Sequence, residues 1–354
     1  MKNANVAEVV VPCQSLDETL AFFVEDLNFR IEMIYPADAP QVAVISAYGV
    51  RLRLDSTTEG EPGSIRIHAD EYPSDIRTRT APNGTKIEFV VDEQKVILPT
   101  LVSSLVVQSG SDRSAFGKGR AGMQYRDLIP GRYGGRFIAS HIQIPSGGPV
   151  PDYVHHHHVQ FQLIFCVNGW VRVVYEDQGE PMLMEAGDCF LQPPHIRHRV
   201  LECSDQMEVV EIGCPAEHET CVDHEMTLPT PNLKPDRLFG GQRFVFHRAA
   251  KTEWQAGKVA GIEYQDTGID NATNGIASLL VWRLNQPVAE VSLDHDGDLR
   301  FLFVLKGTAN LDNGGSRRWQ LQHGDSCAIP SSSNCRLSDV SADFKTLELS
   351  VPSQ

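Results

Sequence analysis

The stretch VHHHHVQFQLIFCVNG, residues 154–169, decides the fold, because it joins four histidines to an apolar strand that ends in Asn-Gly. The apolar part of this stretch occurs twice in the chain. Residues 162–169 read QLIFCVNG and are followed by GDCFLQP at 187–193, whereas residues 300–307 read RFLFVLKG and are followed by GDSCAIP at 324–330. The spacing between the two blocks differs by one residue, so we interpret the regions as copies of one domain.

The sequence around both copies consists of short apolar or alternating runs that are broken by Gly, Pro and Asp. This pattern is typical of β-barrels and sandwiches. A proline-rich segment, residues 228–235, reads as a linker. We therefore expect a mainly β protein with one barrel over residues 106–228 and a second over residues 229–354.

Residues 1–105 differ from the rest and predict a small α+β domain. A strand at 6–11 precedes a helix whose apolar face is formed by Leu16, Leu20, Phe23 and Leu27, and Ser15 with Glu18 reads as a capping box. Strands at 30–35, 41–47 and 50–54 complete a β-α-β-β-β order. Two more strands are expected at 64–68 and 85–91.

The motifs of the first copy resemble those of the cupin superfamily, G-x5-H-x-H-x(3,4)-E-x6-G and G-x5-P-x-G-x2-H. Their positions are held here by Gly148, the histidine run, Gln162, Gly169, Gly187, Pro193, His195 and His198, with Gln162 in place of Glu and His195 in place of Gly. The resemblance covers about residues 120–354. It implies a bicupin, two tandem jelly-roll barrels, with a divalent transition metal (Fe, Zn, Ni or Mn) in the first.

The histidine run allows two sets of ligands. An H-x-H spacing on a strand directs both imidazoles to one face, and imidazole suits these metals. With four residues before Gln162 the ligands are His155 and His157, and with three residues they are His156 and His158.

The second copy favours the first of these sets, because His295 stands four residues before Arg300, which occupies the position of Gln162. We therefore predict His155, His157 and the distant His198 as ligands. Gln162 offers only a neutral carbonyl oxygen, and we expect it either to ligate the metal or to hydrogen-bond to a water on it.

The second barrel is expected to have lost its metal site, since Leu293, Arg300 and Cys335 occupy three of the four ligand positions. This predicts a packing or dimerisation barrel. An anion-binding pocket centred on Arg300 is the functional alternative.

Residues 11–29, VPCQSLDETLAFFVEDLNF, resemble part of one module of the vicinal-oxygen-chelate, or glyoxalase-like, superfamily, and the match covers about residues 5–56. Members usually pair two such modules around a metal. No second module is evident here, so Glu8 and Asp55 are interpreted as surface charges rather than as relics of that metal site. A half-open sheet also suggests pairing with another chain.

Other polar residues are weaker candidates. Cys214, His218, Cys221 and His224 lack a usual zinc spacing and are interpreted as a loop over the barrel mouth. His195 and Arg197 either line that mouth or lie in a solvated turn. Further residues that could face a ligand are Tyr125, Arg136, Gln143 and Tyr153.

The composition limits the partners and the location. A net charge of −15 and a pI near 5.3 argue against nucleic acid or an anionic membrane as the partner. The absence of a long apolar run or signal peptide predicts a cytoplasmic protein, and eight scattered cysteines fit free thiols.

The resemblance implies a metal-dependent enzyme, of the dioxygenase type, that acts on a small organic molecule. An all-neutral ligand set favours an anionic one. The alternatives are a non-redox metalloenzyme, such as an isomerase or decarboxylase, and a non-catalytic binding or sensor protein. Cupin barrels commonly pair through edge strands, which implies a homodimer.

Overall fold

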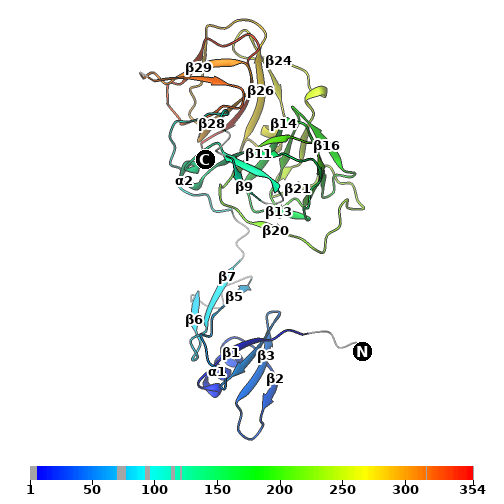
Figure 1. Cartoon of the computed structure of the whole chain (residues 1–354), viewed down its shortest axis with the longest axis vertical. Helices are drawn as coiled ribbons and strands as arrows, with labels where there is room; N and C mark the ends of the chain where they lie inside the picture. Colours follow the sequence, from blue (N-terminus) through cyan, green and yellow to red (C-terminus); the bar gives the residue numbers. More distant parts are fainter. Residues whose placement is uncertain are drawn as a thin grey trace. The chain divides into compact units, whose positions relative to one another are not determined.

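The protein was analysed as a computed structural model, which describes residues 6–69, 77–91, 96–112, 116–119, 122–315 and 317–353. The chain divides into two compact units, Met1–Lys95 and Val96–Gln354 (Figure 1). The described secondary structure is mainly β, as predicted. None of the described helices is long and apolar enough to cross a membrane.

The first unit follows the predicted β-α-β-β-β order. Its main sheet has the order β1-β4-β3-β2, and β1 runs parallel to β4. The strands are β1 (Val9–Pro12), β2 (Arg30–Tyr35), β3 (Val42–Ala47) and β4 (Val50–Asp55). A second sheet, of order β5-β7-β6, contains β5 (Ser64–Ala69), β6 (Thr78–Thr80) and β7 (Lys86–Val91).

The helix of this unit packs on its sheet through the predicted apolar face. Helix α1 (Leu16–Ala21) continues directly into a π-helix, η1 (Phe22–Asp26). Leu16, Phe23 and Leu27 are buried in the core of the unit.

The predicted capping box is wrong. Ser15 is the N-cap residue, but its side chain makes no capping hydrogen bond. Its backbone carbonyl instead accepts a 3.2 Å hydrogen bond from the Thr19 N–H.

The second unit contains two barrels. The first barrel consists of a seven-stranded and a six-stranded sheet. The larger sheet is, in order, β23 (Val245–His247), β17 (Cys189–Gln192), β14 (Phe161–Asn168), β19 (Met207–Cys214), β11 (Ile138–Ile144), β10 (Gln124–Asp127) and β9 (Gly117–Lys118). The smaller is β16 (Met182–Glu185), β15 (Trp170–Tyr175), β18 (His198–Cys203), β13 (His155–His157) and β20 (Thr220–Val222), with β12 (Gly148–Pro149) paired to β18.

The second barrel repeats this plan with a seven-stranded and a four-stranded sheet. The larger sheet is β24 (Gln255–Ala256), β25 (Ile262–Asp266), β26 (Ser278–Leu284), β33 (Lys345–Val351), β28 (Leu299–Lys306), β31 (Ser326–Ile329) and β8 (Val106–Gln108). The smaller is β27 (Glu290–Ser292), β32 (Arg336–Ser338), β29 (Thr308–Asp312) and β30 (Arg318–Gln322). Short elements complete the unit: α2 (Arg132–Gly135), β21 (Leu238–Phe239), β22 (Gln242–Arg243), the 3-10 helix η4 (Ala249–Lys251) and α3 (Ile269–Ala272).

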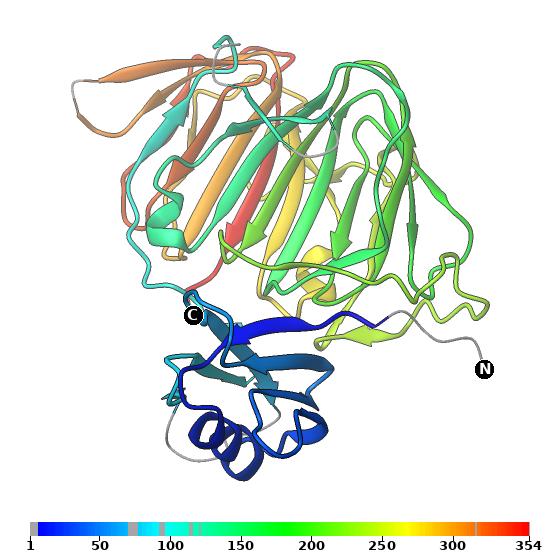
Figure 2. The same cartoon turned by 60° about the horizontal axis from the view of Figure 1, so that its bottom comes forward.

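The two seven-stranded sheets share one apolar core, and their long strands lie side by side in Figure 2. On β14, Phe161, Leu163 and Phe165 belong to this shared core. The intervening side chains of Gln162 and Ile164 line a cavity inside the first barrel. The period-two alternation of a strand therefore supplies both the contact between the barrels and the wall of the cavity.

The barrels also exchange strands. β8, which lies at the start of the range expected for the first barrel, pairs with β31 of the second. β23, which follows the proline-rich segment, pairs with β17 of the first. Both pairings thus cross the boundary between the two barrels that was expected at residues 228–229.

His247 on β23 is expected to make stability depend on pH. It is buried, and burial lowers its pKa, with Lys345 acting in the same direction and Asp188 and Asp266 opposing it. The unfolded chain, with a histidine pKa near 6.5, therefore binds a proton that the folded chain resists. The free energy of unfolding that depends on neutral His247 is therefore fully present above about pH 6.5 and is lost as the pH falls below that value.

The measurement is the melting temperature between pH 7.5 and 5 for the wild type and for His247→Asn, which cannot take up the proton. Other histidines titrate in both proteins, so the difference isolates His247. Parallel curves for the two proteins would contradict the prediction.

Candidate metal centre

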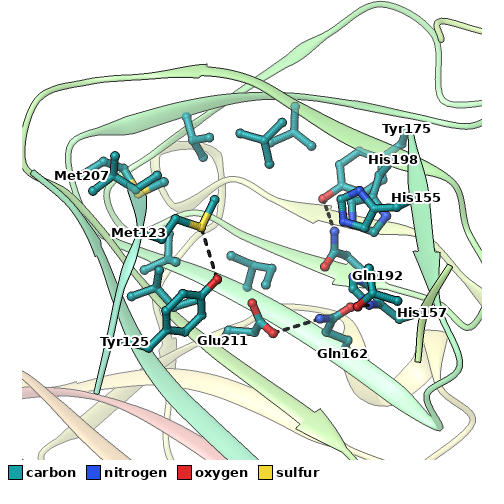
Figure 3. A pocket seen from close by; sticks show the side chains of 18 of the residues that line it. Met123, Tyr125, His155, His157, Gln162, Tyr175, Gln192, His198, Met207 and Glu211 are labelled. Carbon is teal, nitrogen blue, oxygen red and sulfur yellow. Dashed lines mark hydrogen bonds between the residues drawn. The ribbon is translucent and has the colours of Figure 1, made fainter. Parts of the chain in front are cut away.

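A cavity of about 220 Å³ lies inside the first barrel, between its two sheets (Figure 3). One part of its wall is apolar and includes Ile142, Val171, Val173, Met207 and Val209. The polar part is formed by His155, His157, Gln162, Tyr175, Gln192, His198, Glu211, His218 and Thr220. The cavity is thus an apolar chamber with polar groups gathered on one part of its wall.

Three imidazoles converge on this cavity. β13 carries His155 and His157 on one face, and His155 pairs in register with His198 at the start of β18. One possible ligand atom from each of the three residues lies within 4.8 Å of the others, and all three side chains are buried. The structure thus brings together the three histidines that the sequence predicted as ligands.

The orientation of each ring is set by a hydrogen bond at Nδ1. The partners are the Tyr153 carbonyl for His155 at 2.8 Å, Thr220 Oγ1 for His157 at 3.0 Å and the Ile196 carbonyl for His198 at 3.0 Å. Histidine ligands of metals typically bond their second nitrogen in this way. The arrangement indicates Nε2 as the nitrogen through which each ring could hold a metal.

Gln162 lies beside this trio and is held by Glu211. Its Nε2 donates a 3.0 Å hydrogen bond to Glu211 Oε1, which Figure 3 shows as a dashed line. Its Oε1 is buried without a hydrogen-bond partner among the described residues. An amide fixed through its nitrogen presents its oxygen as the group that can accept or ligate.

Glu211 was missed by the sequence analysis. On β19, Met207, Val209 and Glu211 alternate toward the cavity. This alternation was visible in the sequence, where it marks a carboxylate on the inner face of a strand. The negative charge absent at position 162 is therefore supplied by the neighbouring strand.

Tyr175 and Gln192 were also missed. Gln192 Nε2 donates a 3.0 Å hydrogen bond to the Tyr175 hydroxyl, and the tyrosine ring stacks on His198 at 5.5 Å between centroids. Complete burial raises the pKa of Tyr175, which keeps the phenol protonated. Tyr175 thus packs against the ring of His198, Gln192 holds Tyr175, and both groups are uncharged.

The side chains of the alternative ligand set, His156 and His158, do not line the cavity. His156 and His158 alternate with the cavity histidines and lie in a separate cluster with His195. Burial, then Arg197 and the neighbouring histidines, lower the pKa of His156 to about 4. His195 therefore belongs to this outer cluster and does not line the described cavity.

The structure places the weaker candidates in different surroundings. His218 lines the cavity and contacts His157 at 5.4 Å between ring centroids, and Tyr125 also lines it. Cys214 is buried, whereas His224 and Tyr153 are exposed.

Arg136 and Gln143 are engaged away from the cavity. Arg136 forms a 3.1 Å ion pair with Asp298 of the second barrel, and Gln143 donates a 3.1 Å hydrogen bond to Glu208.

In the second barrel, Arg300 and Glu348 correspond in register to Gln162 and Glu211. Arg300 Nη2 lies 2.6 Å from Glu348 Oε1, and Trp282 Nε1 donates a 2.8 Å hydrogen bond to the same carboxylate. The charge of Arg300 is therefore neutralised within the barrel, which argues against the anion-binding pocket considered for it.

The interior of the second barrel is filled by larger side chains. Trp282 and Phe344 occupy the register positions of Ile142 and Met207, which line the cavity of the first barrel. Leu293 and Cys335, at the positions of His155 and His198, are buried in the same apolar cluster. No histidine cluster is found in the described part of this barrel.

Comparison with known proteins agrees with this architecture. Residues 140–213, which lie in the first barrel, match the cupin domain family. No curated protein matches the chain by sequence.

Solved structures resemble the chain over about three quarters of its length. A protein described as glyoxylate-induced, from Pseudomonas aeruginosa, has a TM-score of 0.53 and 12% identity, covering 73% of this chain and 92% of its own. An oxalate decarboxylase variant from Bacillus subtilis has 0.52 and 12%, covering 74% and 80%. A salicylate 1,2-dioxygenase variant from Pseudoaminobacter salicylatoxidans has 0.51 and 17%, covering 73% and 87%. At these identities the likeness shows the fold alone.

Proposed function

We propose that the first barrel is the active site of a metal-dependent enzyme of the dioxygenase type, which acts on a small organic monoanion. The observation that carries this proposal is the convergence of His155, His157 and His198 at the wall of a cavity that is otherwise largely apolar. Such a cavity places a small molecule in an apolar environment beside a metal.

The donor set fits a divalent transition metal. Three neutral imidazoles suit Fe, Mn, Ni or Zn, and the buried Gln162 Oε1 is a neutral fourth donor. When bound, such a metal would supply Lewis-acid and, for iron or manganese, redox chemistry, while leaving coordination positions for other ligands. Among the similar structures, the Bacillus subtilis oxalate decarboxylase is described with Mn(II) centres.

The charge of the cavity favours a monoanion. Glu211 is the only carboxylate in its described lining, which contains no lysine or arginine. A dication together with Glu211 leaves one net positive charge, which a single negative charge on the ligand would neutralise. An enolate or a monocarboxylate therefore fits this cavity better than a dicarboxylate does.

The chain's own residues would position the ligand and manage one proton. The apolar wall excludes water and packs against the carbon skeleton of the ligand. Gln162 holds Glu211 through Oε1, so Oε2 of Glu211 is the atom that accepts a proton from an enolisable ligand.

A second candidate is a non-redox isomerase or decarboxylase, and Glu211 is the observation that favours it. A carboxylate in an enclosed cavity beside a Lewis acid can transfer a proton without any oxidant. The two candidates differ in their need for oxygen.

The test is to remove the metal by chelation and reload the full chain separately with Fe(II), Mn(II) or Zn(II). Oxygen uptake and product formation are then followed with enolisable diketones and aromatic monocarboxylates, with dicarboxylates as the control. Oxygen uptake that needs Fe(II) or Mn(II) is the expected result. Turnover with Zn(II) in the absence of oxygen would replace the first candidate by the second, and turnover under no condition would contradict both.

Glu211→Gln is expected to lower kcat by about 100-fold or more, the usual range for loss of a positioned proton acceptor. The amide can still accept the hydrogen bond from Gln162, so the metal content should not change. Steady-state kinetics and metal analysis of the same preparation check both points. Full activity in the variant would exclude a proton-transfer role for Glu211.

A further inference from the structure

A second group of histidines lies on the outer side of β13 and of the residue that follows it. Because side chains alternate along a strand, His156 and His158 face away from the cavity that His155 and His157 line. His195, from the turn before β18, joins them. The centroid of its ring lies 5.8 Å from that of His156 and 4.8 Å from that of His158.

These three imidazoles have the separation of a metal site. One ring nitrogen from each of His156, His158 and His195 lies within 4.8 Å of the others. His156 Nδ1 is buried and has no hydrogen-bond partner among the described residues. A buried nitrogen without a partner is costly unless a ligand or ion satisfies it.

Strand β20 and the residue before it add a thiol and a carboxylate beside His158, and Cys221 and Glu219 form with His158 a second group whose possible ligand atoms lie within 4.8 Å of one another. Cys221 pairs in register with His156, and its Sγ lies 3.8 Å from His158 Nε2. Bond lengths of about 2.3 Å to sulfur and about 2.0 Å to nitrogen put these atoms roughly 3.6 Å apart in a tetrahedral zinc site. The observed separation is therefore close to that of two ligands of one ion.

The carboxylate orients one of the rings. Glu219 Oε2 lies 3.2 Å from His158 Nδ1, which directs Nε2 of the same ring toward Cys221. Carboxylates commonly hold metal-binding histidines in this way. The nearby positive charge of Arg197 is balanced by Asp223 at 3.2 Å.

We propose that His156, His158, His195 and Cys221 form a second metal site, which binds zinc or a similar borderline ion. The site is distinct from the cavity, since none of these four residues lines it. Four protein ligands make a closed site, so its role is structural. The ion would tie β13, β20 and the turn before β18 together.

His195 provides a variant that should preserve the fold. Its φ of 65° lies in the left-handed region, and Ser332, at the corresponding turn of the second barrel, has a φ of 56°. The conformation therefore belongs to the barrel, and glycine adopts it more readily than histidine. His195→Gly therefore removes the imidazole, and the glycine can adopt the backbone conformation that this turn requires.

Cys221 provides a direct readout. It is the only one of the eight cysteines that is not buried. Zinc bound to its sulfur should slow alkylation by iodoacetamide by about tenfold or more, because the reagent attacks the unbound thiolate. The full chain is treated with and without Zn²⁺, and the labelled peptide is identified by mass spectrometry.

Protection of Cys221 is expected in the wild type, in the cavity variant His198→Ala and in the control His224→Ala, whose histidine is exposed and outside both clusters. It should be absent in His195→Gly. No protection in the wild type, or full protection in His195→Gly, would overturn the proposal.

Equilibrium dialysis with Zn²⁺ separates the two sites. The wild type should bind two ions, and both His195→Gly and His198→Ala should bind one. If the wild type binds one ion and Cys221 is protected, the outer site stands and the cavity site fails.

Discussion

His198→Ala is expected to lower the metal affinity of the cavity by more than about 100-fold, since even loss of a group that only supports a ligand typically costs about 10–100-fold. His198 closes the trio from a different strand, so the pair on β13 alone cannot hold the ion as tightly. Catalytic activity should fall with the metal content. Metal analysis after dialysis against a weak chelator measures the loss.

His224→Ala serves as the matched control, because its histidine is exposed on the loop after β20. His157→Ala should reproduce the loss. Cavity metal retained in both His157→Ala and His198→Ala would show that the cavity histidines are not the ligands.

Arg300→Gln is expected to destabilise the second unit by about 3 kcal/mol, the usual cost of leaving a buried charge without its partner. The change copies the Gln162–Glu211 pair of the first barrel but leaves the Glu348 carboxylate charged in a filled interior. The melting temperature should fall by roughly 6–12 °C.

The double variant Arg300→Gln/Glu348→Gln should recover most of this loss, because it removes the stranded charge and keeps an acceptor for Trp282. Thermal unfolding of the four proteins, single variants included, gives the coupling. A stability of Arg300→Gln within about 0.5 kcal/mol of the wild type would contradict the prediction.

The sequence was sufficient for the parts of the fold that repeat or alternate. The duplicated blocks predicted two barrels, and the β-α-β-β-β order of the first unit was correct. The exchange of β8 and β23 could not be predicted, since both strands are only three residues long and their partners are distant in sequence. Short strands carry too little pattern to identify a partner.

The candidate site likewise has parts that the sequence predicted and parts that it did not. The comparison with His295 of the second copy favoured His155 and His157 over their neighbours, and the structure brings these two together with His198. Glu211 escaped notice because its role depends on a neighbouring strand rather than on a motif. The ion pair of Arg300 could not be predicted either, since its partner Glu348 is 48 residues away in the sequence.

The exchanged strand β8 bears on the order in which the protein is made. β8 leaves the ribosome early, but its partner β31 is synthesised more than 200 residues later. At about 5–20 residues per second, this strand waits for roughly 10–40 s without its neighbour. The second barrel is therefore completed only when β31 has been synthesised and pairs with β8, which is translated near the start of the unit. A premature stop between β23 and β31 would release a chain that contains the strands of the first barrel but lacks β31, the partner of β8.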